Sequence, residues 1–394
     1  MNETVSQNLE MDKFDAIRPY YDEEVPGVIE NLLQDREFIS LIGKFRLPRL
    51  TKIIPPLSYL LIRSYLRAQL KGISNIRGWQ EVAAGYARRL IDTSMDHLAF
   101  ANLEHLDLQV PHLFVSNHRD IAGDSMLVNF GLYTHGGNTV RIAVGDNLVQ
   151  KKYATDIMRL NKSFFIQRSV SGVKNLLRAL TLSSEYIHQS LREGESVWIA
   201  QREGRSKDGR DLTDPAIIKM FALALRKAAF GEVIKSLSIV PVAVSYEYDP
   251  CDLLKAREMS VRESSGRYEK PEGEDLLSLV TGLSGYKGRV VVSFGEPLSD
   301  DYESPEAVAL EVDRQILSMY QLFPVNYYAL SLLDADQYSE MGPRDDKGNL
   351  IKSEDKYLDE RLQECPPDHR KWLIRMYANP VISKKQLQSR LLQP

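Results

Sequence analysis

The chain has 394 residues, of which 43% are hydrophobic, and its formal net charge is −4. This length suffices for one large domain or two to three small ones, and the charge balance argues against a nucleic-acid-binding protein. Two widely separated cysteines, Cys251 and Cys365, fit a reducing compartment and exclude a disulfide-stabilised scaffold. The polar N-terminus predicts no secretory signal, and the absence of a run of about 20 apolar residues predicts no membrane span.

The first 90 residues are expected to be mostly helical, with breaks at Pro48 and at Pro55-Pro56. Residues 1–37 are strongly acidic. Residues 38–80, in contrast, contain eight Lys and Arg and neither Asp nor Glu.

Within this basic stretch, Arg63, Arg67 and Lys71 recur every four residues and would form one stripe beside a wide apolar face. Residues 44–71 therefore suit the surface of an anionic membrane. A helix that packs on the protein and leaves its basic edge in water explains the same pattern.

From about residue 96, strands and helices alternate. Strands are expected at 97–102, 111–116, 139–144, 163–168, 196–201, 237–247 and 289–294. Helices are expected at 124–134, 150–160, 173–192 and 215–229, the last with Asp214 as its N-cap and Pro215 in its first turn. The alternation predicts an α/β fold with a central mixed sheet of about seven strands covered by helices.

We expect the chain to consist of three parts. They are an N-terminal helical, membrane-surface region at 1–90, the α/β domain at 91–320, and a charged helical C-terminal extension at 321–394. Residues 252–288 are charged and contain Gly and Ser, which indicates an excursion from the α/β domain rather than a domain boundary.

A candidate general base follows the strand expected at 111–116. His118 can take a proton near neutral pH, and a carboxylate on its other ring nitrogen would fix the tautomer and stabilise the imidazolium. Asp124 and Asp120 are the candidate partners, and Asp120, two residues from His118, is better placed to shape the turn. Taken alone, Asp124 could equally be a helix N-cap and His118 a structural histidine.

Two other interpretations of this segment fail. His118-Arg119-Asp120 is similar to the catalytic loop of protein kinases, but Ser125 stands where a kinase has Asn, and no Asp-Phe-Gly triplet follows. A metal site built from the same His and Asp residues would lack a second histidine at ligand spacing, so no metal is expected.

Arginines follow two later strands. Arg168 comes after the run at 163–166, and the loop at 201–210 contains two glycines with Arg202, Arg205, Lys207 and Arg210. Arginine's planar fork suits phosphate, and glycine lets backbone N–H groups approach it, although most arginines merely lie at the surface. A base and arginines at successive strand ends predict a hydroxyl nucleophile on a phosphorylated substrate.

Four segments together resemble the glycerolipid acyltransferase family. They are Asn117-His118 with Asp124, Phe165-Ile166-Gln167-Arg168, Glu203-Gly204-Arg205-Ser206 and Val240-Pro241. The resemblance covers roughly residues 96–300. The chain departs from the family pattern in two places: five residues rather than four separate His118 from Asp124, and one residue is missing between Gly204 and Arg205.

The resemblance implies a role for each segment. His118 would be the general base and Asp124 would orient it, while Arg168 and Arg205 would bind the acceptor phosphate with help from Lys207 or Arg210. Backbone N–H groups near Gly204 would stabilise the oxyanion, and Asn117, Asp120, Glu203 and Pro241 would support the site. No cofactor or metal is implied, because the acyl group arrives on acyl-CoA or acyl-carrier protein.

The implied reaction is acylation of 1-acyl-glycerol-3-phosphate to phosphatidate in phospholipid synthesis. Glycerol-3-phosphate or another lysolipid is the alternative acceptor. A hydrolase of lipids or phosphoesters and a non-catalytic phospholipid-binding protein are alternatives of other classes. We expect the protein in the cytoplasm, peripheral on the inner face of the cytoplasmic membrane.

Overall fold

The computed structural model describes residues 13–146, 151–299 and 301–391. The chain divides into two compact units: unit 1 comprises Met1–Arg88 and Val140–Ser190, and unit 2 comprises Arg89–Thr139 and Leu191–Pro394. This division crosses the expected three-part boundaries, because the N-terminal helices belong with a segment from the middle of the chain. The start of the N-terminal region, residue 150 of the helix expected at 150–160, and residues 392–394 lie outside the described residues.

Unit 1 begins with a group of helices whose breaks fall at the expected prolines. Pro48 and Pro55 each occupy the first turn of a helix, where a missing N–H costs nothing. The elements are η1 (Asp22–Glu24), α2 (Val25–Gln34), α3 (Arg36–Arg46), α4 (Pro48–Ile53), α5 (Pro55–Gln69) and α6 (Ile76–Ser94). The apolar faces of α2, α3, α5 and α6 share one core, to which Ile29, Ile39 and Ile62 contribute.

The rest of unit 1 holds two short strands and two helices. Strands β3 (Arg141–Gly145) and β4 (Ser163–Ile166) pair in parallel, and α8 (Lys152–Leu160) connects them. Helix α9 (Val173–Arg192) follows over the expected residues. Among the described residues of the whole chain, no helix is both long enough and apolar enough to cross a bilayer.

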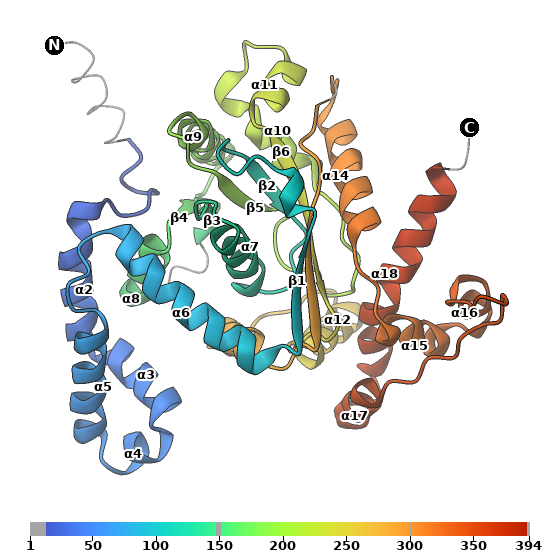
Figure 1. Cartoon of the computed structure of the whole chain (residues 1–394), viewed down its shortest axis with the longest axis horizontal. Coiled ribbons are helices and arrows are strands. Elements are labelled where there is room, and N and C mark those ends of the chain that lie inside the picture. Colours follow the sequence, from blue (N-terminus) through green and yellow to red (C-terminus); the bar gives the residue numbers. More distant parts are fainter. Residues whose placement is uncertain (1–12, 147–150, 300, 392–394) are drawn as a thin grey trace. The chain divides into compact units, whose positions relative to one another are not determined.

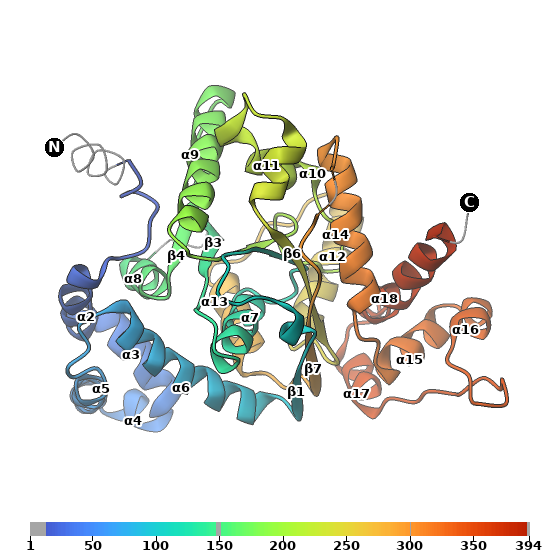
Figure 2. The same cartoon turned by 45° about the horizontal axis from the view of Figure 1, so that its top comes forward.

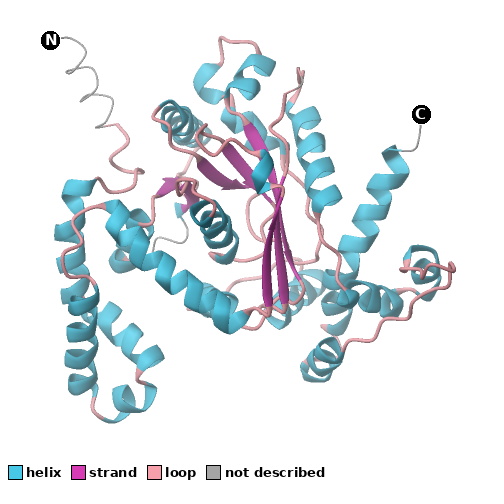
Figure 3. Cartoon of the chain, in the orientation of Figure 1, coloured by secondary structure: helices cyan, strands magenta, loops and turns pink. Residues whose placement is uncertain are grey.

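Unit 2 is built on a five-stranded mixed sheet, whose strong twist is visible in Figure 3. Its order is β1-β7-β6-β2-β5, and only the β6–β7 pair is antiparallel. The strands are β1 (His97–Ala101), β2 (Leu113–Ser116), β5 (Val197–Ala200), β6 (Ile239–Tyr246) and β7 (Arg289–Phe294). Every residue of β2 and β6 is buried, as expected for central strands that helices cover on both faces.

Helices connect and cover these strands. They are α7 (Gly123–Thr134), α10 (Pro215–Phe221), α11 (Phe230–Ser236), α12 (Asp252–Ser265), α13 (Glu274–Ser284) and α14 (Pro305–Met319), with short 3₁₀ turns η2 (Leu103–His105) and η4 (Leu223–Leu225). Helix α14 lies along β6 (Figure 1).

The expected α/β class is confirmed, and the described residues hold the expected seven strands, five in unit 2 and two in unit 1. The helix expected at 215–229 is wrong in its second half. The Asp214 side chain caps α10 at the Ala216 N–H, but α10 ends at Phe221, and the extended backbone of Ala229 begins a separate helix, α11.

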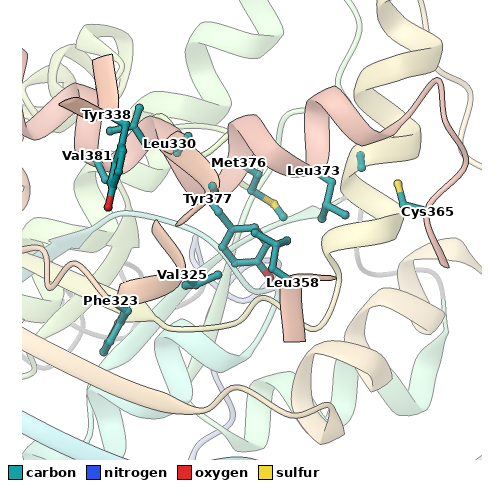
Figure 4. Close-up of a cluster of buried hydrophobic side chains, with 13 residues drawn as sticks. Phe323, Val325, Leu330, Tyr338, Leu358, Cys365, Leu373, Met376, Tyr377 and Val381 are labelled. Atoms are coloured by element: carbon teal, nitrogen blue, oxygen red, sulfur yellow. The ribbon is translucent and has the colours of Figure 1, made fainter. Parts of the chain in front are cut away.

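The C-terminal extension, residues 321–394, forms four helices in its described part. They are α15 (Pro324–Leu333), α16 (Ala335–Met341), α17 (Lys356–Glu364) and α18 (Arg370–Leu391). They share a core that includes Val325, Leu358, Leu373 and Tyr377 (Figure 4). Helix α18 also packs against α12 and α14 (Figure 2). The segment at 252–288 supplies α12 and α13, so it is part of the compact unit.

Candidate active site

Two parallel strands of unit 2 bring the first and third predicted segments to one edge of the sheet. Ser116, the last residue of β2, lies opposite Ala200, the last residue of β5. The His118 segment and the arginine loop (residues 201–210) therefore both begin at the same edge of the sheet. The carboxyl ends of parallel strands are where α/β folds place their ligand sites.

His118 and Asp124 lie in direct contact. His118 Nδ1 is 2.8 Å from Asp124 Oδ2, and because an ionised carboxylate can only accept, Nδ1–H is the donor. The partly exposed His118 ring also packs edge-on against Trp198, with 6.0 Å between ring centroids. Within the described part of the chain, Nε2 makes no hydrogen bond, so it can accept a proton from a bound molecule.

Asp124 is fully buried and receives three more hydrogen bonds. The backbone N–H groups of Arg119 and Asp120 donate to Oδ2 at 2.7 and 3.0 Å, and the Tyr246 hydroxyl donates to Oδ1 at 2.8 Å. Burial acts to raise the pKa of Asp124, but the bonds from His118 and the two backbone amides outweigh it and hold the pKa below its ordinary value. Asp124 is thus held ionised beside His118.

The rival carboxylate has another task. Asp120 Oδ1 accepts from the backbone N–H groups of Ala122 and Gly123 at 3.0 and 2.7 Å, which closes the turn that leads into α7. Burial, and then the neighbouring Asp124 charge, raise the pKa of Asp120 above its ordinary value. Asp124, and not Asp120, makes the side-chain contact with His118.

A buried ion pair supports the same edge of the sheet. Arg119 Nη2 donates to Asp211 Oδ2 at 2.6 Å and to the carbonyl of Gly209 at 3.2 Å. Burial opposes the charge of Arg119, but the facing Asp211 carboxylate raises its pKa well above the ordinary value. Asn117 exchanges two hydrogen bonds with the backbone of Val244, which ties the end of β2 to β6.

The arginine loop reaches the His118 segment through its backbone. The Ser206 N–H donates to the His118 carbonyl at 2.7 Å, so Arg205 stands one residue from this contact. Arg205 is half-buried, and among the described residues its Nη1 is buried without a hydrogen-bond partner. A buried guanidinium nitrogen with no protein acceptor is a natural place for an anion.

The other charged residues of the loop are placed differently. Lys207 pairs with the buried carboxylate of Glu258, and burial lowers the pKa of Lys207 although Glu258 opposes this effect. Arg210 and Glu203 are exposed. Gly204 has a φ of +73°, a backbone conformation that glycine adopts without strain. The structure therefore offers Arg205 to an anion more directly than Lys207.

The remaining predicted residues lie in strands or just beyond them. Pro241 is the third residue of β6, opposite Val115 of β2, where its carbonyl accepts from Gly295 N–H. Arg168 follows β4 and is half-buried in unit 1. No group of three or more His, Cys, Asp or Glu that could hold a metal ion occurs among the described residues.

Tyr246 and Asp211 are site residues that the sequence analysis missed. Both act across long separations: Tyr246 is 122 positions from Asp124, and Asp211 is 92 positions from Arg119. Their one sequence signal is position, because Tyr246 ends the strand that begins at Ile239 and Asp211 follows the arginine loop.

Comparison with known proteins agrees with this geometry. Residues 97–245 match the protein family described as Acyltransferase. The chain is 27% identical over 227 residues to the glycerol-3-phosphate acyltransferase of Pseudomonas fluorescens (strain SBW25). The alignment covers 57% of this chain and 23% of that protein. It is 26% identical over 216 residues to the human dihydroxyacetone phosphate acyltransferase. That alignment covers 54% of this chain and 29% of the human protein.

A solved structure is also similar. The crystal structure of the 1-acyl-sn-glycerophosphate (LPA) acyltransferase PlsC from Thermotoga maritima aligns with a TM-score of 0.38 at 14% identity, over 72% of this chain and 95% of that one. The curated relatives are far longer than the matched region, and the chain spans less than a third of their length.

Residues 97–245, with a His–Asp pair at a strand end, thus form an acyltransferase domain. This domain is similar to glycerol-3-phosphate and dihydroxyacetone phosphate acyltransferases, in agreement with the resemblance that the four segments indicated.

Proposed function

We propose that the protein transfers a fatty acyl group from a thioester to the free hydroxyl of 1-acyl-glycerol-3-phosphate and so makes phosphatidate. The contact of His118 Nδ1 with buried, ionised Asp124 carries this proposal, because it leaves Nε2 as a base for a hydroxyl. The acyl donor is acyl-CoA or acyl-carrier protein.

The reaction needs one base and no acyl-enzyme. His118 Nε2 takes the hydroxyl proton as the acceptor oxygen attacks the thioester carbonyl, and Asp124 stabilises the imidazolium that forms. The tetrahedral intermediate then collapses, the C–S bond breaks, and the sulfur leaves as a thiol with the proton that His118 returns. The products are the new ester and free thiol, so protons and electrons balance.

Arg205 is the proposed phosphate ligand. Its unpartnered Nη1 and its connection to His118 through Ser206 would hold the acceptor phosphate a short distance from the base. Arg210 is proposed to add charge to the same phosphate. Lys207 would take part only by exchanging Glu258 for the substrate.

Glycerol-3-phosphate is the second candidate acceptor, favoured by the similarity to the glycerol-3-phosphate acyltransferase of Pseudomonas fluorescens. An assay with lysophosphatidate, glycerol-3-phosphate, dihydroxyacetone phosphate and a lysolipid without a terminal phosphate separates the acceptors. We expect the highest kcat/KM with lysophosphatidate. Arg205→Ala should lower kcat/KM for the phosphorylated acceptors only. Preference for the phosphate-free lysolipid would contradict the proposal.

Unit 1 carries a surface suited to reaching a lipid acceptor. Between the end of α3 and the first half of α5, a group of large apolar side chains is exposed, and we name it the corner patch: Phe45, Ile53, Ile54, Leu57, Leu60 and Leu61. The exposed cations Lys44, Arg46, Arg49 and Lys52 lie in the same segment. Apolar side chains flanked by cations favour an anionic membrane, so we propose peripheral attachment to the inner face of the cytoplasmic membrane.

Vesicle flotation tests the corner patch. Ile53→Glu with Leu57→Glu should abolish binding to anionic phosphatidylglycerol vesicles, because each lost side chain removes about 1.5–3 kcal/mol of apolar transfer. Leu310→Glu, at a similarly exposed apolar site on α14, is the matched control and should bind like the unaltered protein. Equal binding by all three proteins, or binding that salt does not weaken, would count against the proposal.

A further inference from the structure

The arginine loop has a second set of contacts, made by the C-terminal extension. Asn379 of α18 donates through Nδ2 to the backbone carbonyl of Asp208 at 2.6 Å. Asn379 is only 4% exposed, so water does not compete for this bond. A helix about 170 positions away in sequence thus holds the backbone of the loop that carries Arg205.

The second contact joins Gly209 to the backbone of α18. A Cβ built on Gly209 would lie 2.1 Å from the carbonyl oxygen of Met376, so only glycine permits this approach. Gly209 also has a φ of +80°. Pro380 lies inside α18 and has no N–H to donate to that carbonyl four residues earlier, which leaves the Met376 oxygen outside the helical ladder where the loop approaches.

Helix α18 is itself fixed to unit 2 by buried polar contacts. The Tyr377 hydroxyl donates to Asp252 Oδ2 at 3.1 Å and accepts from the Asp249 N–H, also at 3.1 Å. Asn326 of α15 donates to the Tyr377 carbonyl at 2.9 Å. These contacts anchor α18 to α12 and α15, so it can act as a rigid support for the loop.

The loop is therefore held from two directions within unit 2. The His118 segment binds it through the Ser206 N–H and through Arg119, whose guanidinium donates to the Gly209 carbonyl. Helix α18 binds it at Asp208 and Gly209. Arg205 directly precedes the first of these attachments, at Ser206, and among the described residues its Nη1 has no hydrogen-bond partner.

We propose that α18 positions the arginine loop for the acceptor phosphate, with Asn379 as the positioning residue. The inference rests on the proposed function in one respect, that Arg205 binds this phosphate. Loss of the Asn379 bond would let the loop backbone relax at Asp208 and displace the guanidinium, while His118 and Asp124 keep their geometry. Acceptor binding should then weaken while chemistry on bound substrate is little altered.

The test compares Asn379→Ala with Tyr328→Phe in the full chain. Tyr328→Phe removes a hydroxyl that donates to Asp359 of α17, a bond within the same extension that involves neither α18 nor the loop, so it should lower Tm without changing the loop. Asn379→Ala should raise the acceptor KM roughly tenfold, with kcat and the thioester KM little changed. Hydrogen exchange of the backbone amides at 203–210 should become faster in Asn379→Ala alone.

Gly209→Ala is a second variant, expected to raise the acceptor KM in the same way because its Cβ forces the loop away from Met376. Unchanged acceptor KM and unchanged exchange in Asn379→Ala would overturn the inference, as would equal effects of Asn379→Ala and Tyr328→Phe. If the unaltered protein acylates no glycerol phosphate, the proposed function fails. Faster loop exchange in Asn379→Ala would then still show that α18 holds the loop.

Discussion

Asp124 is the residue that positions the His118 base. Both of its carboxylate oxygens are used, Oδ2 by His118 and two backbone amides and Oδ1 by Tyr246. Since a buried charge is costly unless it is paired and hydrogen-bonded, this set of donors explains how an ionised carboxylate persists at a fully buried position. The one-residue excess between His118 and Asp124 is absorbed in the turn that Asp120 closes.

Replacing each aspartate separately should show which one serves His118. Asp124→Asn should lower kcat by about 10²–10⁴-fold, because the imidazolium loses its counter-charge. Asp120→Asn keeps an oxygen for the N–H groups of Ala122 and Gly123 and should retain most of the activity. Steady-state kinetics of the two purified variants decides the matter, and equal tolerance of both changes would exclude the His–Asp pair.

Tyr246→Phe tests the donor to Asp124 Oδ1. Without the hydroxyl, Asp124 Oδ1 loses the hydrogen bond that Tyr246 donates, and the carboxylate is held less firmly against His118. We expect kcat to fall roughly tenfold, since a buried acceptor is left unsatisfied. Tyr248→Phe, which removes a hydroxyl bonded to Asp355 instead, is the control. A kcat in Tyr246→Phe as high as in Tyr248→Phe would show that this hydroxyl does not support the His–Asp pair.

At the scale of elements, Asp313 links α14 to Thr213, which follows the arginine loop, and the pKa of this carboxyl group is raised. Asp313 Oδ1 accepts from both the N–H and the hydroxyl of Thr213, at 2.7 and 2.6 Å. Burial raises the pKa of Asp313 to about 6 although these bonds oppose it. The folded protein therefore binds this proton more tightly than the unfolded chain, whose Asp pKa is about 3.9.

The sign of the pH dependence follows from that difference. Below about pH 4, protonation of Asp313 adds at most about 3 kcal/mol to the free energy of unfolding. This contribution is lost as the pH rises to about 6. Asp313→Asn keeps an oxygen that accepts from Thr213 but cannot titrate. The stability of this variant should therefore decline less between pH 4 and 7. Tm measured from pH 4 to 7 tests it, with Glu306→Gln, exposed on the same helix, as the control. A decline as steep in Asp313→Asn as in the unaltered protein would refute the assignment.

Elements with strong local signals were predicted well from the sequence. The seven strand ranges agree with the structure within two residues at each end, because each buried strand is a short apolar run between turns. The break after Phe221 was missed since no proline or glycine marks it. The contacts of Tyr246 with Asp124 and of Asn379 with Asp208 depend on which strands and helices become neighbours, which local pattern does not encode.

For the whole molecule, the two compact units suggest a division of tasks. Unit 2 contains the His–Asp pair, the arginine loop and the C-terminal extension that supports it, whereas unit 1 contains Arg168 and the corner patch. The N-terminal helices and the segment at 140–190 form one unit although the first acyltransferase segment lies between them in sequence. Sequence order alone therefore did not predict the compact units.

His118 is proposed to be the base for acyl transfer to a phosphorylated acceptor. Thiol release from acyl-CoA by the purified protein, with and without lysophosphatidate, tests it directly. We predict release that depends on the acceptor and that falls by about 10²–10⁴-fold in His118→Ala. Full activity of His118→Ala would contradict the base assignment, and equal thiol release without the acceptor would identify a hydrolase instead.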